Sequence, residues 1–209
     1  MRGYLHEVCG AANGLVLTHG AGSNCQAPLL VAVAEAFAAA GWTVLRCDLP
    51  FRQTRPHGPP SPAMAAQDRD GLRRAVQLLR RIVSGRVGLG GHSYGGRQAT
   101  IAAAEDPQLA DALLLLSYPL HPPSRPAELR TAHFPRLLTP ALFVHGTRDP
   151  FGSIDEMRQA LLLLPAERRL LEVEGAGHDL ASRPSKARGL AARLVAEFPS
   201  FAASTDSVR

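Results

Sequence analysis

Short apolar segments recur along the chain, separated by longer segments of helical periodicity. The apolar segments span residues 15–18, 43–47, 87–90, 112–116, 141–144 and 170–173. They lack a regular polar face, so each is expected to be a strand buried on both sides, as in a parallel sheet covered by helices. Residues 1–13 are weakly patterned and are expected to add one edge strand.

The segments between these strands predict helices at about 28–40, 62–84, 96–105, 154–164 and 184–198. In the first of them the apolar residues fall at helical spacing, Pro28 suits the first turn and Gly41 suits the C-terminal stop. This alternation predicts an α/β fold, with helices on both faces of a mostly parallel sheet of six or seven strands.

The remaining segments set the domain limits. The proline-rich stretches at 49–62 and 119–140 are expected to be surface connections rather than domain boundaries. We therefore expect one domain over residues 1–199, followed by a flexible tail at 200–209, which is small and polar.

Composition excludes several classes of protein. The chain has 209 residues, and no apolar run approaches the roughly 20 residues that a bilayer requires. The first residues lack the apolar region of a signal peptide, and the three cysteines have no metal-site spacing. We therefore expect a cytoplasmic protein with structural thiols, no membrane contact, and a monomeric or homodimeric state.

The formal net charge of +5 comes almost entirely from arginine, since Lys186 is the only lysine. A positive charge raises the question of nucleic-acid binding. However, the arginines are scattered and form no run longer than a pair. A solvated basic surface is the preferred interpretation, and no nucleic-acid partner is expected.

One motif indicates a nucleophilic serine. Gly91-His92-Ser93-Tyr94-Gly95 lies between a predicted strand and a predicted helix. A Gly-x-Ser-x-Gly in this context is typical of a nucleophile elbow, a sharp turn that pushes the serine hydroxyl out of the sheet. Glycines two positions before and after the serine avoid a clash across the turn. Ser93 is therefore the candidate nucleophile.

A serine hydroxyl needs a base, and the base needs an acid to orient it. Asp149 and His178 each follow a predicted strand, and the order Ser, Asp, His is that of one serine-hydrolase architecture. Both would then lie at the carboxyl edge of the sheet, where ligands bind. Asp155 and Asp179 are the alternative acids; the first is expected to lie within a helix, and the second adjoins His178 itself.

Acyl transfer also needs donors for the oxyanion. The backbone N–H of Tyr94 is expected to supply one, at the start of the elbow helix. The second is expected from the small residues of the loop after the first strong strand, from Ala21 or Gly22, and the sequence does not choose between them.

These motifs resemble those of the α/β-hydrolase superfamily over nearly the whole chain. The small, lidless, dienelactone-hydrolase-like branch is the most similar. The segments at 18–24 and 145–152 also resemble the hydrolase-like domain of the non-specific-lethal chromatin complex subunit and its testis-expressed relatives. Dienelactone hydrolases use a cysteine nucleophile, whereas this chain has Ser93, so that activity is not carried over. The resemblance implies an acyl-enzyme mechanism that needs no metal or cofactor, with the elbow strand beside the strand at 15–18.

The expected substrate is a small carboxylic ester or thioester. Only residues 117–139 occupy the place where larger relatives insert a lid, which predicts an open site. Arg52, Arg97 and His121 are candidates to line its mouth and to favour an anionic group, the alternative being surface or structural roles. The alternative function is a non-catalytic interaction protein that retains the fold.

Overall fold

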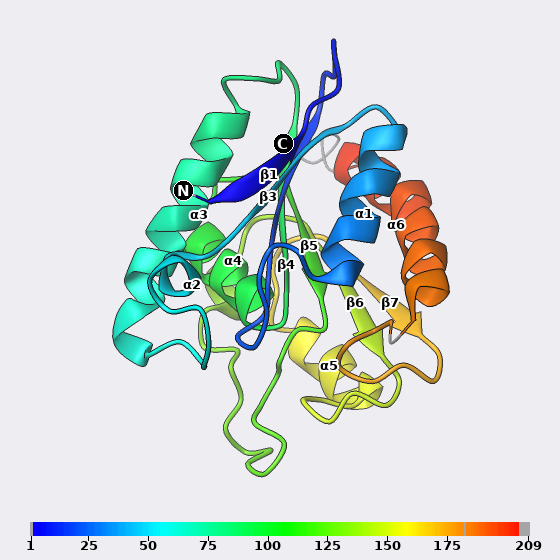
Figure 1. The fold of residues 1–209 in the computed structure, drawn as a ribbon. Coiled ribbons are helices and arrows are strands. Elements are labelled where there is room, and N and C mark those ends of the chain that lie inside the picture. The colour runs from blue at the N-terminus through cyan, green and yellow to red at the C-terminus, as the bar shows by residue number, and fades with distance from the viewer. Residues whose placement is uncertain (1, 182, 205–209) are drawn as a thin grey trace.

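The computed structural model describes residues 2–181 and 183–204 of the chain. Within them, seven strands form one sheet in the order β1-β3-β2-β4-β5-β6-β7 (Figure 1). The strands are β1 (Gly3–His6), β2 (Gly14–Thr18), β3 (Thr43–Cys47), β4 (Val87–His92), β5 (Ala112–Leu116), β6 (Ala141–Gly146) and β7 (Arg168–Val173). Only β1 pairs antiparallel to its neighbour; all other pairs are parallel. The mostly parallel α/β sheet is thus confirmed.

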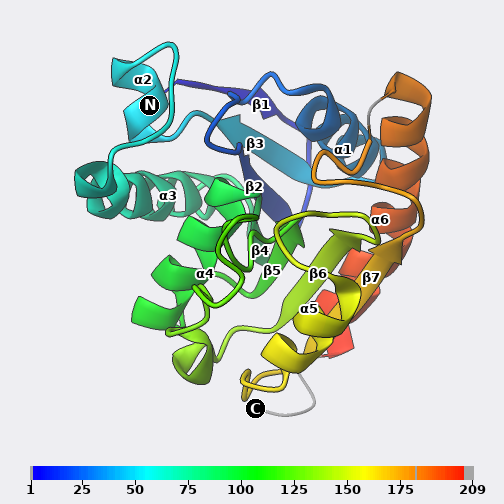
Figure 2. The same cartoon turned by 90° about the horizontal axis from the view of Figure 1, so that it is seen from below.

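Helices cover both faces of this sheet (Figures 1 and 2). The helices are α1 (Pro28–Ala39), α2 (Pro50–Thr54), α3 (Ala65–Leu79), α4 (Tyr94–Glu105), α5 (Ile154–Leu161) and α6 (Pro184–Ser204), with short 3-10 turns η1 (Pro62–Met64) and η2 (Phe134–Arg136). α1 and α6 pack together on one face, and α3 and α4 pack together on the other. Each face has its own core of buried apolar side chains, which explains why the central strands lack a polar face.

Strand order determines where a ligand can approach the sheet. The chain passes from β2 outward to β3 and then returns to place β4 on the other side of β2. This reversal between β2 and β4 is the topological switch point at which open α/β sheets bind ligands. The expected pairing of the elbow strand with the strand at 15–18 is confirmed, in the register Thr18 to Gly91.

Three local predictions were wrong. The segment at 49–62 is not simply a loop, because it contains α2, whose Phe51 and Arg52 are buried. The helix expected to open at Pro62 begins with the 3-10 turn η1, and α3 follows from Ala65.

The last helix does not end at Phe198 but continues through Ser204. Phe201 is fully buried against the α1 face, which holds the extra turns in place. The expected flexible tail at 200–209 is therefore helical over 200–204, and residues 205–209 lie outside the described part of the chain.

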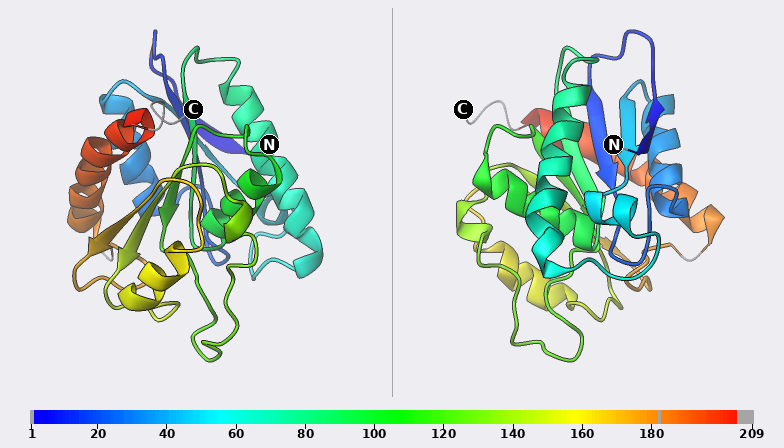
Figure 3. Two further views of the ribbon diagram at one scale, coloured as in Figure 1. Left: turned by 180° about the vertical axis from the view of Figure 1, so that it is seen from behind. Right: turned by 60° about the vertical axis from the view of Figure 1, so that its left-hand side comes forward.

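The connection between β5 and β6 projects from the carboxyl edge of the sheet (Figures 1 and 3). It spans residues 117–140, of which 117–139 is the segment expected in place of a lid, and contains only η2 as a regular element. No helix in the described residues combines the length and apolarity that crossing a bilayer requires.

Candidate active site

Ser93 lies in a strained turn between β4 and α4. Its φ is 50° and its ψ is −116°, a conformation that non-glycine residues rarely adopt. A Cβ on Gly91 would lie 2.6 Å from the carbonyl carbon of Gly95, and one on Gly95 would lie 2.5 Å from the carbonyl oxygen of His19. Both positions therefore require glycine, as the elbow motif predicts.

The structure brings Ser93, Asp149 and His178 into contact. The His178 Nε2 atom lies 2.8 Å from the Ser93 Oγ. On the other side of the ring, Nδ1 lies 3.0 and 2.9 Å from the two carboxylate oxygens of Asp149. Because a carboxylate only accepts, Nδ1 carries the proton, and Nε2 is left free to accept the hydroxyl proton of Ser93.

The carboxylate of Asp149 is held in its charged form. Its side chain is fully buried, which by itself raises its pKa. Hydrogen bonds from His178 and from the Phe151 amide outweigh the burial and hold the pKa of Asp149 below its ordinary value. The ring of Phe151 also stacks on the imidazole of His178, with centroids 4.1 Å apart. Phe151 was not among the sequence-derived candidates.

Neither alternative acid bonds to the imidazole. Asp155 lies in the first turn of α5 and accepts a hydrogen bond from Arg158. Asp179 is exposed, and both ring nitrogens of the neighbouring His178 already have other partners.

Two further histidines support these groups. His92 Nε2 donates to the carbonyl oxygen of His178, at 2.9 Å, and burial lowers the pKa of His92. His145 is fully buried, and its Nε2 donates to the Gly152 carbonyl oxygen at 2.7 Å; burial lowers its pKa as well. Both rings are thus neutral donors, which position the segments carrying His178 and Asp149. Sequence analysis missed the His92 contact, because it joins residues 86 positions apart.

The expected oxyanion donors lie beside the nucleophile. Tyr94 is the first residue of α4, so its amide has no acceptor within the helix. A Cβ on Gly20 would lie 3.3 Å from the Cβ of Ser93, so the loop after β2 packs directly against the elbow. Within the described residues, no backbone acceptor is found for the amides of Ala21 and Gly22.

The prediction that Arg52 lines the mouth of the site was wrong. Its side chain is buried and donates to the carbonyl oxygens of Ala21, Ser23, Arg55 and Gly58. The reason is α2, which turns Arg52 toward the loop after β2. Arg52 therefore fixes the loop that carries the candidate oxyanion donors.

The prediction for His121 was also wrong. Its side chain is 5% exposed, Nδ1 lies 2.9 Å from the carbonyl oxygen of Pro122, and Nε2 lies 3.5 Å from a carboxylate oxygen of Glu156. Its amide donates to the Phe151 carbonyl oxygen, so His121 joins the 117–139 segment to the loop after β6. Arg97, by contrast, is partly exposed on the first turn of α4.

A pocket of about 350 Å³ adjoins the site on the α1 and α6 face. Gly20 and His92, which adjoin Ser93, line the pocket together with His19 and Ser23. The rest of the lining is mainly apolar and consists of Ala27, Pro28, Leu29, Leu30, Ala181 and Pro184. Asp179 and Arg183 add charge to its lining. A small apolar group fits this space. In the described part of the chain, no three His, Cys, Asp or Glu side chains gather as a metal site would require.

Comparison with known proteins gives a consistent result. A family model described as the alpha/beta hydrolase domain matches residues 11–202. The chain is similar to a dienelactone hydrolase from Anabaena variabilis, with 25% identity, coverage of 92% of this chain and 88% of that chain, and a TM-score of 0.73.

Two further solved structures share the fold. One is Est1E from Butyrivibrio proteoclasticus, with 17% identity, coverage of 95% and 94%, and a TM-score of 0.73. The other is XC6422 from Xanthomonas campestris, described as an α/β serine hydrolase without lid, with 18% identity, coverage of 92% and 84%, and a TM-score of 0.68. The relation to the non-specific-lethal complex subunit stays a prediction.

Proposed function

Because this chain belongs to the α/β-hydrolase family and is similar to its lidless, dienelactone-hydrolase-like members, we propose that it is a serine hydrolase of small carboxylic esters or thioesters. The observation that carries the proposal is the unbroken hydrogen-bonded chain from the Ser93 hydroxyl through His178 to Asp149.

In the proposed reaction, Ser93 Oγ attacks the carbonyl carbon while His178 Nε2 takes its proton. The resulting imidazolium is stabilised by the buried Asp149 carboxylate, which stays ionised. His178 then returns the proton to the departing alcohol or thiol, leaving an acyl group on Ser93. Water, deprotonated by the same imidazole, releases the carboxylic acid and restores the enzyme.

The negative charge that develops on the carbonyl oxygen needs preorganised donors. The Tyr94 amide is one, at the positive end of the α4 dipole. The close approach of Gly20 to Ser93 favours the adjoining Ala21 amide as the second, with Gly22 as the alternative. Arg52 supports this arrangement, since it holds the Ala21 and Ser23 carbonyl groups.

The pocket beside Ser93 supports a small substrate. Its volume of about 350 Å³ is at the lower end of the range for ligand pockets, and its walls are mainly apolar. The proposed substrate therefore places a short apolar portion against α1.

The proposal is tested with a fluorophosphonate probe, which phosphonylates activated serines. We expect wild-type protein to be labelled at Ser93 and to hydrolyse short-chain 4-nitrophenyl esters, and Ser93→Ala to lose both properties while remaining folded. Ser84→Ala is the control, since Ser84 is an exposed serine in the connection between α3 and β4, away from the site. If folded wild-type protein is not labelled and cleaves no ester, the non-catalytic interaction protein becomes the better hypothesis.

A further inference from the structure

Arg97 lies on the same face of α4 as the nucleophile. It follows Ser93 by four positions, and its amide donates to the Ser93 carbonyl oxygen at 3.0 Å. Residues four apart in a helix are neighbours, and helical side chains lean toward the N-terminus. The Arg97 side chain is thus directed toward the end of the helix from which the Ser93 hydroxyl emerges.

The guanidinium of Arg97 has no partner among the described residues. Its Nε atom is inaccessible to solvent and makes no hydrogen bond, and no carboxylate forms an ion pair with it. Other arginines on the same face of the molecule do have such partners: Arg69 and Arg73 both bind Glu105. Because buried donors are nearly always satisfied, an unpaired arginine beside a candidate nucleophile needs an explanation.

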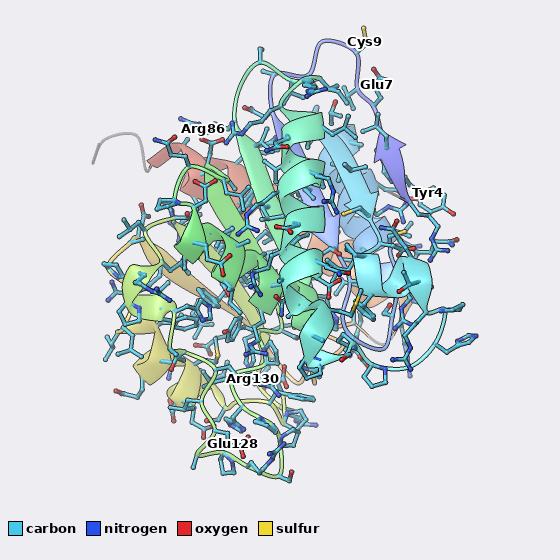
Figure 4. All side chains as sticks on the ribbon, turned by 90° about the vertical axis from the view of Figure 1, so that its left-hand side faces the viewer. Tyr4, Glu7, Cys9, Arg86, Glu128 and Arg130 are labelled. Atoms are coloured by element: carbon cyan, nitrogen blue, oxygen red, sulfur yellow. The ribbon has the colours of Figure 1, made fainter. Side chains whose placement is uncertain are left out.

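A second arginine approaches from the 117–139 segment. Figure 4 labels Arg130 on this projecting segment, together with Glu128. Arg130 is partly buried; its amide donates to the Leu120 carbonyl oxygen and its Nη1 donates to that of Pro119. Burial lowers the pKa of Arg130, and the positive charge of Arg97 lowers it further, as expected for two cations that share one region.

Among the described residues no carboxylate forms an ion pair with Arg97 or Arg130, and the negative charge of Glu128 offsets that of Arg130 only in part. Glu128 pairs with Arg125, and Glu105 is occupied by Arg69 and Arg73. The nearby His133 is neutral, because burial, followed by the charges of Arg97 and Arg136, lowers its pKa to about 4. The region between the first turns of α4 and the 117–139 segment, which packs on α4 through η2, is therefore positive. The pocket against α1, by contrast, is mainly apolar.

We propose that the substrate ester carries an anionic group, a carboxylate or a phosphate, which Arg97 and Arg130 bind beside Ser93. The inference rests on the proposed function and deepens it by naming the substrate class. Such a ligand supplies the acceptors that Arg97 lacks and relieves the repulsion between the two cations. The apolar portion of the same substrate occupies the opposite pocket, so the two sides of the site orient the ester.

The first test compares three esters that share the same leaving group and the same acyl chain length. They differ only at the end of the acyl chain, which is a carboxylate, a phosphate or a neutral methyl ester. We expect wild-type kcat/KM to be about tenfold or more higher for an anionic ester than for the neutral one. Arg97→Gln is expected to remove most of this preference for the anionic ester, and Arg130→Gln to reduce it. Arg97→Lys is expected to retain part of it. Arg81→Gln, at an exposed arginine in the connection between α3 and β4, is the control and keeps the ratio.

Comparison of the carboxylate, phosphate and neutral esters shows which anion the site prefers. A second series of esters carries the charge on the alcohol instead of the acyl chain, and shows which portion of the substrate the arginines bind. Circular dichroism and thermal unfolding verify that each variant is folded. If Ser93 is labelled by fluorophosphonate but neutral esters are cleaved as well as anionic ones in both series, the inference is overturned and the proposed function stands.

If no ester is cleaved, a binding measurement tests the anion site separately from the proposed hydrolase function. Adipate and inorganic phosphate are titrated calorimetrically into the wild-type, Arg97→Gln and Arg97→Lys proteins. Binding that Arg97→Gln weakens about tenfold or more, and that Arg97→Lys partly restores, supports the anion site even where hydrolysis fails. Absence of binding, or equal binding by wild type and Arg97→Gln, overturns it.

Discussion

The ring of His92 donates a hydrogen bond to the backbone carbonyl oxygen of His178, at 2.9 Å. The residue immediately before the candidate nucleophile thus holds the loop that carries the candidate base. The two rings also contact each other, with centroids 5.3 Å apart. Strand β4 and the loop after β7 are therefore connected at the reacting groups themselves, and not only through the sheet.

We expect His92→Phe to slow the reaction without abolishing it. Phenylalanine keeps an aromatic ring in the buried space but cannot donate to the His178 carbonyl oxygen, so the imidazole loses one positional restraint. A decrease in kcat of about tenfold, with a smaller change in KM, is expected from misplacement of a general base. Steady-state kinetics and the rate of fluorophosphonate labelling measure it. An unchanged labelling rate would show that the contact is not needed for positioning.

Asp149→Asn is expected to reduce kcat by about 10³-fold or more. The amide has nearly the same shape, but it carries no charge to stabilise an imidazolium and can present a donor to Nδ1, favouring the wrong tautomer. Asp155→Asn, in the exposed first turn of α5, is the matched control and keeps wild-type turnover. Equal losses in the two variants would contradict the assignment of the acid.

Gly91→Ala is expected to destabilise the fold by about 2 kcal/mol or more and to abolish labelling of Ser93. A methyl group there would lie 2.6 Å from the Gly95 carbonyl carbon, and both atoms belong to the rigid elbow. Gly189→Ala, on α6, is the control. No atom lies within 4 Å of a Cβ there, and alanine is the better helix former. The free energy of unfolding of this variant is therefore expected to rise by up to about 1 kcal/mol. Urea unfolding monitored by circular dichroism measures both.

Arg52→Met is expected to lower the free energy of unfolding by about 2–4 kcal/mol and to lower kcat. Methionine fills part of the space but leaves four backbone carbonyl oxygens without their donor, two of them on the loop with the candidate oxyanion amides. Arg55→Met, an exposed neighbour, is the control and stays near wild type in both measurements. If Arg52→Met kept full activity towards neutral esters, the loop would not need this support.

The buried His133 predicts a pH dependence of stability. Its pKa of about 4 in the folded protein lies below the ordinary value of 6.5, so the unfolded chain binds more protons between these two values. Stability from this group is present above pH 6.5 and is lost as the pH falls toward 4, at about 1.4 kcal/mol per pH unit within the window.

The check is the free energy of unfolding at about pH 7 and about pH 5, from urea titrations of wild type and His133→Gln. Other buried histidines contribute equally to both proteins. Between these two pH values the free energy of unfolding is therefore expected to fall by about 2 kcal/mol less in the variant than in wild type. His57→Gln, at an exposed histidine, is the control for the substitution. Parallel pH profiles for wild type and His133→Gln would contradict the prediction.

The sequence by itself determined the strands, most of the helices and the elbow. These follow from local rules: the apolar runs require burial on both sides, and the glycine at 91 is required by a contact across one turn. The motif also includes Gly95, although the contact that excludes a Cβ there is with His19, after β2. The order of Ser93, Asp149 and His178 could also be read along the chain, since each candidate follows a strand whose carboxyl end lies at a known edge of the sheet. Their catalytic roles stay predictions.

Only the tertiary structure decided which side chains meet. It joined His178 to Asp149 rather than to Asp179, buried Arg52 beneath the loop after β2, and left Arg97 unpaired beside Ser93. It also extended α6 to Ser204, because Phe201 is fully buried in the apolar core on the α1 and α6 side of the sheet. The direction of a side chain on a loop depends on packing between segments far apart in the chain, and local patterns carry no information about that packing.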